Sequence, residues 1–254
     1  MIRRVVIVIG TAVVGLGALI GVELFLLMRR DYLPGDPGYR IDTRVDPSSG
    51  TTDATPLRLA VLGDSTVAGV GSPTEGESLP VLIAQRVADG ARRPVEVVGF
   101  GESGARTLTI SRQRMPSAAD AFDAVVLVIG ANDATHATPW PDLRRQTVQM
   151  LSGATLSGAP VILAGTPRFN NTAIIPEPLR TILDRYSSIL RGQQQAAAAE
   201  FPGVRFVDLA AEAGPRFVGR PDATSSDGFH PSPIGYGFWA DAIAPVVVGA
   251  VESR

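Results

Sequence analysis

The stretch AVLGDSTVAGVG, residues 60–71, places a serine directly after a run of apolar residues. Residues 58–63 have the length and composition of a strand that is buried on both faces of a sheet. Gly63, Asp64 and Ser65 follow where this strand should end, and small residues continue beyond them. Taken alone, the pattern fits a polar turn as well as a nucleophilic serine, so the rest of the chain has to decide between the two.

Short apolar runs of the same kind recur along the chain, each bounded by Gly, Pro, Asn or Asp. They cover residues 95–101, 124–130, 160–165 and 204–209. Segments with helical spacing lie between or after them, at 79–91, 142–154, 178–200 and 232–251. Strands that alternate with helices form right-handed βαβ units around a parallel sheet. We therefore predict a three-layer α/β/α domain with a flavodoxin-like five-stranded parallel sheet of order 2-1-3-4-5.

Polar clusters follow three further strands of this predicted sheet. GESG (101–104) comes after the second strand, GAND (130–133) after the third, and DGFHP (227–231) after a loop beyond the fifth. Functional groups of open α/β sheets gather beyond the carboxyl ends of the strands, where the strand order reverses. The first and third strands are neighbours in the predicted order, so we expect Ser65 and Asn132 to lie close together.

These clusters contain every group that serine chemistry requires. A serine nucleophile needs a base, the base needs an acceptor that fixes its tautomer, and the oxyanion needs preorganised donors. Ser65 is the candidate nucleophile and His230 the general base. Asp227, three residues earlier, can reach Nδ1 of that imidazole across a tight turn. Candidate oxyanion donors are the backbone N–H groups of Ser65 and Gly104 and the side-chain amide of Asn132.

The four blocks, in this order, resemble the SGNH hydrolases of the GDSL esterase and lipase superfamily, in particular a membrane-anchored bacterial member. The resemblance covers residues 56–251, and the catalytic and oxyanion positions of the family fall on the five residues just named. Two positions depart from the family pattern: Gly99 replaces the usual Asn that opens the second block, and Glu102 is uncommon in an oxyanion turn. The resemblance implies a serine hydrolase that needs no cofactor.

Other polar residues of this edge have weaker assignments. His136 is the only rival base, but it lacks an acid at turn spacing, so we expect it to line the substrate pocket. Arg168, Phe169 and Asn170 belong either to an ordinary connection after the fourth strand or to a substrate-binding lip. Asp64 is expected to cap backbone N–H groups. Two histidines and scattered carboxylates predict no metal site.

The N-terminal region differs in composition from the rest of the chain. Residues 5–28 are apolar apart from one threonine and Glu23, and this run exceeds the ~20 residues needed to cross a hydrocarbon core. A cleavable signal peptide has a shorter apolar region of ~7–15 residues, so residues 1–30 are predicted to be an uncleaved membrane anchor. Residues 31–55, rich in Pro, Gly, Ser and Asp, are predicted to be a flexible linker. The catalytic domain then spans residues 56–254.

Arginines flank both ends of this apolar run, so the charge rule for membrane orientation gives only a slight preference. That preference favours a single-pass protein whose catalytic domain is extracytoplasmic. Gly17 and Gly21 have a spacing that allows helices to approach closely, but this spacing is common in Gly-rich spans, and the oligomeric state is left open. The net charge of −2 and the absence of a basic cluster exclude a nucleic-acid partner. The absence of cysteine excludes thiolate chemistry.

The sequence thus predicts a membrane-anchored serine esterase. Its substrate would be a carboxylic ester of a lipid, a glycan or a small molecule, cleaved through an acyl-enzyme. One alternative keeps the same Ser-His-Asp site but transfers the acyl group to a cell-envelope glycan or lipid. A second alternative is a non-catalytic envelope assembly protein, for which a fluorophosphonate probe should not label Ser65.

Overall fold

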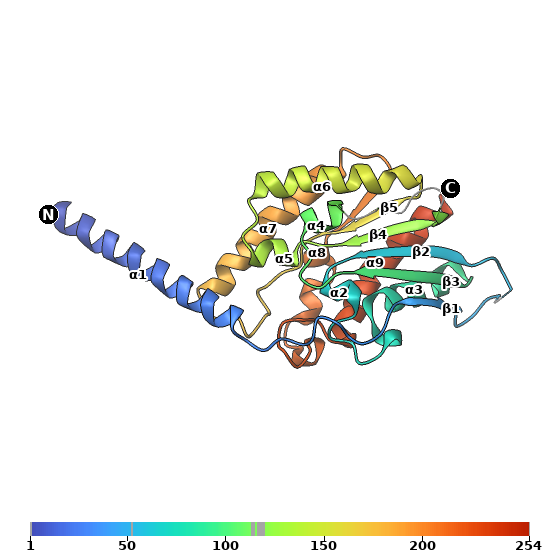
Figure 1. Cartoon of the computed structure of the whole chain (residues 1–254), viewed down its shortest axis with the longest axis horizontal. Coiled ribbons are helices and arrows are strands. Elements are labelled where there is room, and N and C mark those ends of the chain that lie inside the picture. Colours follow the sequence, from blue (N-terminus) through green and yellow to red (C-terminus); the bar gives the residue numbers. More distant parts are fainter. Residues whose placement is uncertain (1, 52, 113–114, 116–119, 254) are drawn as a thin grey trace.

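A computed structural model describes residues 2–51, 53–112, 115 and 120–253. It shows one mixed sheet with helices on both faces, and a long N-terminal helix that projects from this body (Figure 1). The strands are β1 Asp42–Val45, β2 Leu57–Gly63, β3 Val95–Gly101, β4 Ala124–Val128, β5 Val161–Ala164 and β6 Val204–Val207.

The sheet has the order β1-β3-β2-β4-β5-β6. Strands β2 to β6 are parallel to one another, and they have the predicted 2-1-3-4-5 order, which is confirmed. Strand β2 lies at the centre, where Leu59 pairs with Val97 on one side and with Ala124 on the other. The reversal of strand order therefore falls between β2 and β4, beside Ser65.

The sixth strand corrects the sequence prediction. Strand β1 pairs antiparallel with β3 at the edge of the sheet. It lies within residues 31–55, which we predicted to be a flexible linker without a strand. Only Val45 and the preceding Ile41 are buried there, so the apolar alternation is too short to stand out from its Pro- and Gly-rich surroundings. Gly99 accommodates this edge: its N–H donates to the Ile41 carbonyl over 2.9 Å, and a Cβ at position 99 would lie 3.0 Å from Ile41 Cβ.

Two helical layers cover the sheet (Figure 1). Helices α3 and α9 pack on one face, and α4, α6 and α7 on the other, so the predicted three-layer architecture is confirmed. The helices are α1 Ile2–Met28, α2 Ser65–Ala68, α3 Leu79–Ala91, α4 Thr107–Arg112, α5 Ala131–Thr135, α6 Trp140–Ala154, α7 Leu179–Ala198, α8 Leu209–Glu212 and α9 Pro233–Glu252. Short 3₁₀ turns occupy Glu75–Glu77, Thr155–Ser157, Gly214–Phe217 and Pro221–Ala223.

The strand side chains alternate between the two layers. Leu59 and Val61 pack against α3 and α9, whereas Leu62 packs on the opposite face with Leu127 and with Met150 of α6. All five are at most 2% exposed. The continuous apolar runs of the central strands are thus explained by burial on both faces.

Helix α9 is, among the described residues, the one long and apolar enough to cross a membrane, but 56% of its apolar window is buried inside the protein, as in a core helix. Of the predicted anchor, residues 1–30, the side chains of residues 1–13 and 28 lie outside the described ones. The described apolar part of α1, Val14–Leu27, is shorter than a membrane span. A membrane anchor therefore remains a prediction.

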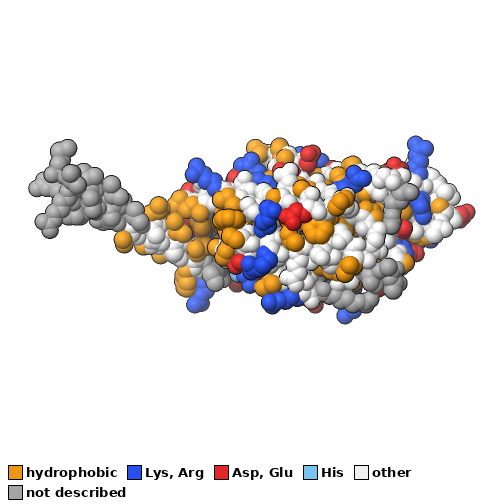
Figure 2. All heavy atoms as spheres, turned by 90° about the horizontal axis from the view of Figure 1, so that it is seen from above, with side chains coloured by type: hydrophobic (Ala, Val, Ile, Leu, Met, Phe, Trp, Pro, Cys, Tyr) orange, Lys and Arg blue, Asp and Glu red, His pale blue; other side chains and the backbone are white. Residues whose placement is uncertain are grey.

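The last turns of α1 pack on the body of the molecule. Glu23 is buried, and its Oε2 accepts a hydrogen bond of 3.2 Å from Leu179 N at the start of α7. Leu27 is also buried, in a cluster with Phe169 and Leu183. Figure 2 shows hydrophobic side chains gathered where α1 joins the body. The exposed ones of α1 are Val14, Leu16, Leu19, Val22, Phe25 and Leu26.

Candidate active site

Ser65 is delivered to the edge of the sheet by the end of β2. Gly63 closes the strand against β4, where a Cβ would lie 2.2 Å from the Val128 carbonyl oxygen. Asp64 then caps helix α2: its Oδ1 accepts from Thr66 N over 3.0 Å and from Thr66 Oγ1 over 2.8 Å. The predicted capping role of Asp64 is confirmed. Ser65 is therefore the first residue of a helix whose start is fixed by its own neighbours.

The structure brings Ser65, His230 and Asp227 into one hydrogen-bonded series. His230 Nε2 lies 3.0 Å from Ser65 Oγ, and His230 Nδ1 lies 2.6 Å from Asp227 Oδ2. Asp227 Oδ1 accepts from Phe229 N (2.9 Å), His230 N (3.0 Å) and Ser225 Oγ (2.9 Å). Because a carboxylate faces Nδ1, that nitrogen carries the proton, and the lone pair of Nε2 faces the serine.

The carboxyl of Asp227 is held in its charged form. Its side chain is 2% exposed, and this burial opposes the charge. The hydrogen bonds from the His230 ring and from the N–H groups of Phe229 and His230 outweigh burial, so the pKa of Asp227 lies well below its usual value. A charged acceptor thus stands behind the imidazole throughout the physiological pH range.

A tight turn sets the spacing of this acid and base. Ser225 N donates to the His230 carbonyl over 2.8 Å, and Thr224 forms a bridge with Pro231. Gly228 has a φ of +70° within the turn, a backbone conformation that other residues adopt with strain. The three-residue spacing between Asp227 and His230 therefore reflects one closed loop that brings the carboxylate to Nδ1 of the ring and turns Nε2 toward Ser65.

Two further donors converge on the same place. Ala105 N donates to the Glu102 carbonyl, and Gly104 takes the third position of this turn with a φ of +79°. Asn132 Nδ2 donates to the Ala105 carbonyl over 3.0 Å, which uses one of its two N–H bonds. In the described part of the chain, no hydrogen bond occupies the backbone N–H of Ser65 or of Gly104.

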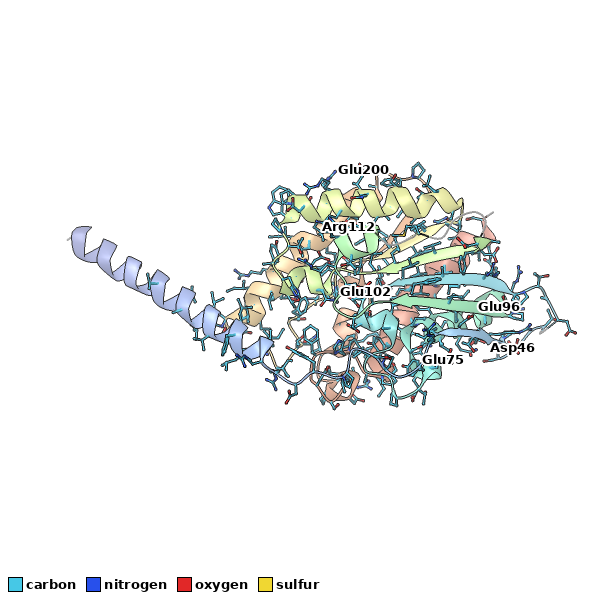
Figure 3. All side chains as sticks on the ribbon, in the orientation of Figure 1. Asp46, Glu75, Glu96, Glu102, Arg112 and Glu200 are labelled. Atoms are coloured by element: carbon cyan, nitrogen blue, oxygen red, sulfur yellow. The ribbon has the colours of Figure 1, made fainter. Side chains whose placement is uncertain are left out.

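Two other carboxylates, Asp133 and Glu102, lie near the site. Asp133 is fully buried, and its Oδ2 accepts from Thr107 N (2.9 Å) and Thr107 Oγ1 (2.8 Å), which ties α5 to the start of α4. Glu102 is exposed just beyond β3, at the opposite end of that strand from Glu96 (Figure 3). Asp133 therefore acts as scaffolding, whereas Glu102 faces solvent at the site's rim.

Two cavities meet at the serine. Ser65, Asn132, Phe229 and His230 line both of them. The larger has a volume of about 490 Å³ and the smaller about 80 Å³. His136 lines the larger cavity. Its Nδ1 lies 2.8 Å from the carbonyl oxygen of Asn132, which is not a carboxylate. His136 therefore has no acid on its Nδ1, unlike His230.

The loop after β5 borders the smaller cavity. Arg168 lines it and forms an ion pair with Asp184, with Nη2 and Oδ2 2.8 Å apart. Phe169 also lines it, although its side chain is 3% exposed and belongs to the core. Asn170 lines neither cavity, whereas its neighbour Asn171 does. Of the three residues proposed for a lip, the structure thus brings Arg168 and Phe169 to the site.

Sequence reasoning missed the contribution of the N-terminal segment. Leu27, Tyr32 and Leu33 line the larger cavity, and Leu33 N donates to Asp227 Oδ2 over 3.3 Å. One signal was present: Glu23 is a carboxylate in an otherwise apolar helix, and such a residue needs a protein partner.

No three His, Cys, Asp or Glu side chains come together as a metal site among the described residues. The fold and this site together define a class of protein. Serine, histidine and aspartate lie in hydrogen-bonded series at the switch point of a doubly wound sheet, and this arrangement is that of a serine hydrolase. The chain has no G-x-S-x-G elbow, so this is not the α/β-hydrolase arrangement.

Comparison with known proteins agrees with this class. A profile of the GDSL-like Lipase/Acylhydrolase family matches residues 61–238, and the chain belongs to this family. It is accordingly a serine hydrolase that acts on ester bonds. GDSL lipase Rv0518 of Mycobacterium tuberculosis is 28% identical over 257 residues, which are 94% of this chain and 96% of that protein.

Solved structures show the same fold. The lipase/acylhydrolase from Enterococcus faecalis superposes with a TM-score of 0.60 at 23% identity, covering 76% of this chain and 96% of its own. The lipase Lip_vut3 from a goat rumen metagenome gives a TM-score of 0.60 at 18% identity, covering 76% of this chain and 98% of its own. Both structures are thus matched almost in full, whereas about a quarter of this chain has no counterpart in them.

Proposed function

We propose that this protein is a membrane-anchored esterase that hydrolyses carboxylic esters through an acyl-enzyme. One observation carries the proposal: Ser65 Oγ, His230 and Asp227 form a continuous series with separations of 3.0 and 2.6 Å. In the first step, Ser65 Oγ attacks the ester carbonyl carbon while His230 Nε2 takes its proton. Asp227 keeps the imidazole oriented and stabilises the imidazolium that forms.

The negative charge that develops on the carbonyl oxygen is met by three donors: the backbone N–H groups of Ser65 and Gly104 and the free N–H of the Asn132 amide. His230 then returns the proton to the departing alcohol oxygen, leaving the acyl group on Ser65. A water molecule, activated by the same imidazole, attacks the acyl-enzyme, and the carboxylic acid is released with Ser65 restored.

We further propose the domain organisation that fits this activity. Residues 1–30 anchor the chain in the membrane, residues 31–55 follow the anchor and supply the edge strand β1 of the sheet, and residues 56–254 form an extracytoplasmic catalytic domain. The exposed apolar side chains of α1 support the anchor, because a helix in water does not present such a surface without a cover. Digestion of the domain by a protease added to intact cells is the expected result, whereas protection of the domain would reverse the orientation.

The test uses the full chain in detergent, with p-nitrophenyl acetate as substrate and a fluorophosphonate probe. We expect hydrolysis and covalent labelling, both abolished in Ser65→Ala. Ser226→Ala, a change of an exposed serine beside Asp227, should retain both. Activity that survives in Ser65→Ala would overturn the mechanism. Addition of a sugar acceptor separates hydrolysis from acyl transfer: more acylated sugar than free acid would make the protein an acyltransferase.

A further inference from the structure

The larger cavity at Ser65 has walls from two parts of the chain that are far apart in sequence. One wall is the catalytic edge of the sheet, with Gly104 and Asn132. The other comes from the end of α1 and the residues that follow it. Leu24, Leu27, Tyr32 and Leu33 line the cavity from this side. We call these four residues the N-terminal wall.

Specific contacts hold the N-terminal wall in place. Its helical end is fixed by Glu23, which is buried and accepts from Leu179 N over 3.2 Å. Tyr32 Oη donates to the Leu27 carbonyl over 3.0 Å, and the Tyr32 ring meets the Phe229 ring edge-on at 5.5 Å. These contacts join the wall to the loop of the catalytic acid and base.

The wall also touches the acid itself. Leu33 N donates to Asp227 Oδ2, over 3.3 Å, and this is the oxygen that faces His230 Nδ1. Residue 33 is therefore tied to the acid of the site, and it lines the cavity that Ser65 also lines.

The two cavities differ in what they can hold. The larger has a volume of about 490 Å³, and its N-terminal wall is built of leucine and tyrosine. The smaller holds about 80 Å³, and it is lined by polar side chains such as Arg168 and Asn171 and by apolar ones such as Phe217 and Trp239. An ester bound at Ser65 has to direct its acyl and alcohol parts away from the carbonyl in two directions. An apolar acyl chain matches the larger cavity, and a small alcohol part matches the volume of the smaller one.

We propose that the N-terminal wall is the specificity element of this esterase, binding the acyl chain of medium- and long-chain esters. The inference rests on the proposed function and names its substrate class. The wall lies outside the part of the chain that the family profile matches, which begins at residue 61.

The test fills the cavity from the wall. Leu24 is half-buried and lines the cavity, so Leu24→Trp shortens the space for an acyl chain. Leu26→Trp is the matched control, because Leu26 lies on the same helix, is 58% exposed and does not line the cavity. Each buried methylene contributes about a fourfold preference. We therefore expect Leu24→Trp to lower kcat/KM for p-nitrophenyl octanoate at least tenfold and to leave p-nitrophenyl acetate within about twofold.

All variants are assayed as full chains at one detergent concentration, so the partition of the ester between water and detergent micelles is the same for each variant. A third ester, octyl acetate, carries the long chain on the alcohol side. Equal effects of Leu24→Trp and Leu26→Trp would overturn the inference, as would a loss confined to octyl acetate. Should Leu24→Trp lose acetate hydrolysis as well, Leu24→Ala decides: it opens the cavity and should shift the preferred acyl length upward, and an unchanged preference overturns the wall's role.

These outcomes are separate from a failure of the proposed function. A wild-type chain that hydrolyses neither acetate nor octanoate and takes no fluorophosphonate label overturns the esterase itself, and the inference falls with it. A wild-type chain that hydrolyses both esters, with a chain-length preference unaffected by any change at Leu24, overturns the wall alone.

Discussion

Replacing Asp227 by asparagine should inactivate the enzyme without unfolding it. The amide oxygen of the variant can still accept the backbone N–H groups of Phe229 and His230, which Oδ1 accepts now. The amide nitrogen then takes the place of Oδ2, 2.6 Å from His230 Nδ1. Because two N–H donors cannot face each other, the imidazole is forced into the tautomer that carries its proton on Nε2.

The consequence falls on the nucleophile. In this tautomer, Nε2 donates to Ser65 Oγ and no longer accepts its proton, so Ser65 loses its base. Loss of the correct tautomer costs on the order of 10⁴-fold in kcat, which corresponds to about 5.5 kcal/mol of transition-state stabilisation. KM for p-nitrophenyl acetate should change little, because Asp227 does not line either cavity beside the serine, and the loss of its contact with Leu33 N concerns the wall that binds longer acyl chains.

The assay is steady-state hydrolysis of p-nitrophenyl acetate by the full chain, with Tm as a measure of folding. Ser225→Ala is the matched control: it removes a hydroxyl donor from the same carboxylate but leaves the 2.6 Å contact with His230 in place. We expect less than a tenfold loss for this control. A Tm-matched Asp227→Asn variant with kcat within tenfold of wild type would refute the assignment of Asp227 as the group that orients His230.

Two further predictions concern residues on either side of the serine. Asn132→Ala should lower kcat by about 10²- to 10³-fold with KM little changed, since it removes one oxyanion donor; a large rise in KM with kcat intact would exclude that role. Burial raises the pKa of Asp64, although the hydrogen bonds from Thr66 and the charge of His230 lower it. The Asp64 carboxylate therefore destabilises the folded state as pH rises above the unfolded pKa of ~3.9. Asp64→Asn keeps the acceptor for Thr66 and should therefore raise Tm relative to wild type more at pH 7 than at pH 4, and an equal difference at both pH values contradicts this.

The central sheet could be predicted because its middle strands β2, β4 and β5 are buried on both faces. Strand β3 was predicted over its full length and β2 to within one residue, since both are mainly apolar and end at a glycine. Helix α3 has the predicted bounds for a similar reason: one face of it is buried over thirteen residues. In a long segment, the pattern of apolar residues repeats often enough to show which face is buried.

Short elements were missed for the opposite reason. Helix α2 has four residues and α5 has five, which is too few for a helical period to repeat. Strand β1 exposes most of its side chains at the sheet edge and depends on β3 for its backbone hydrogen bonds. Their conformations are set by neighbours that only the folded chain supplies.

Some contacts of the site could likewise be predicted from the sequence, and others could not. The approach of Ser65 to Asn132 follows from topology, because β2 and β4 are neighbours and the carboxyl ends of parallel strands share one edge. The contact between Leu33 and Asp227 joins residues 194 positions apart through a backbone N–H, and a backbone donor has no signature in the amino-acid sequence. It depends on the route that the segment after α1 takes across the surface.

The buried contact of Glu23 with the start of α7 has a consequence for how the proposed anchor would seat the enzyme. Residues 5–22, which precede Glu23, are eighteen in number and span about 27 Å as a helix, close to the ~30 Å of a hydrocarbon core. The helix then leaves no spacer between the bilayer and the catalytic domain, and the larger cavity, which Leu24 lines, opens at the level of the lipid headgroups. Substrate would arrive by lateral diffusion within the leaflet, so turnover would follow the mole fraction of the ester in the membrane rather than its bulk concentration.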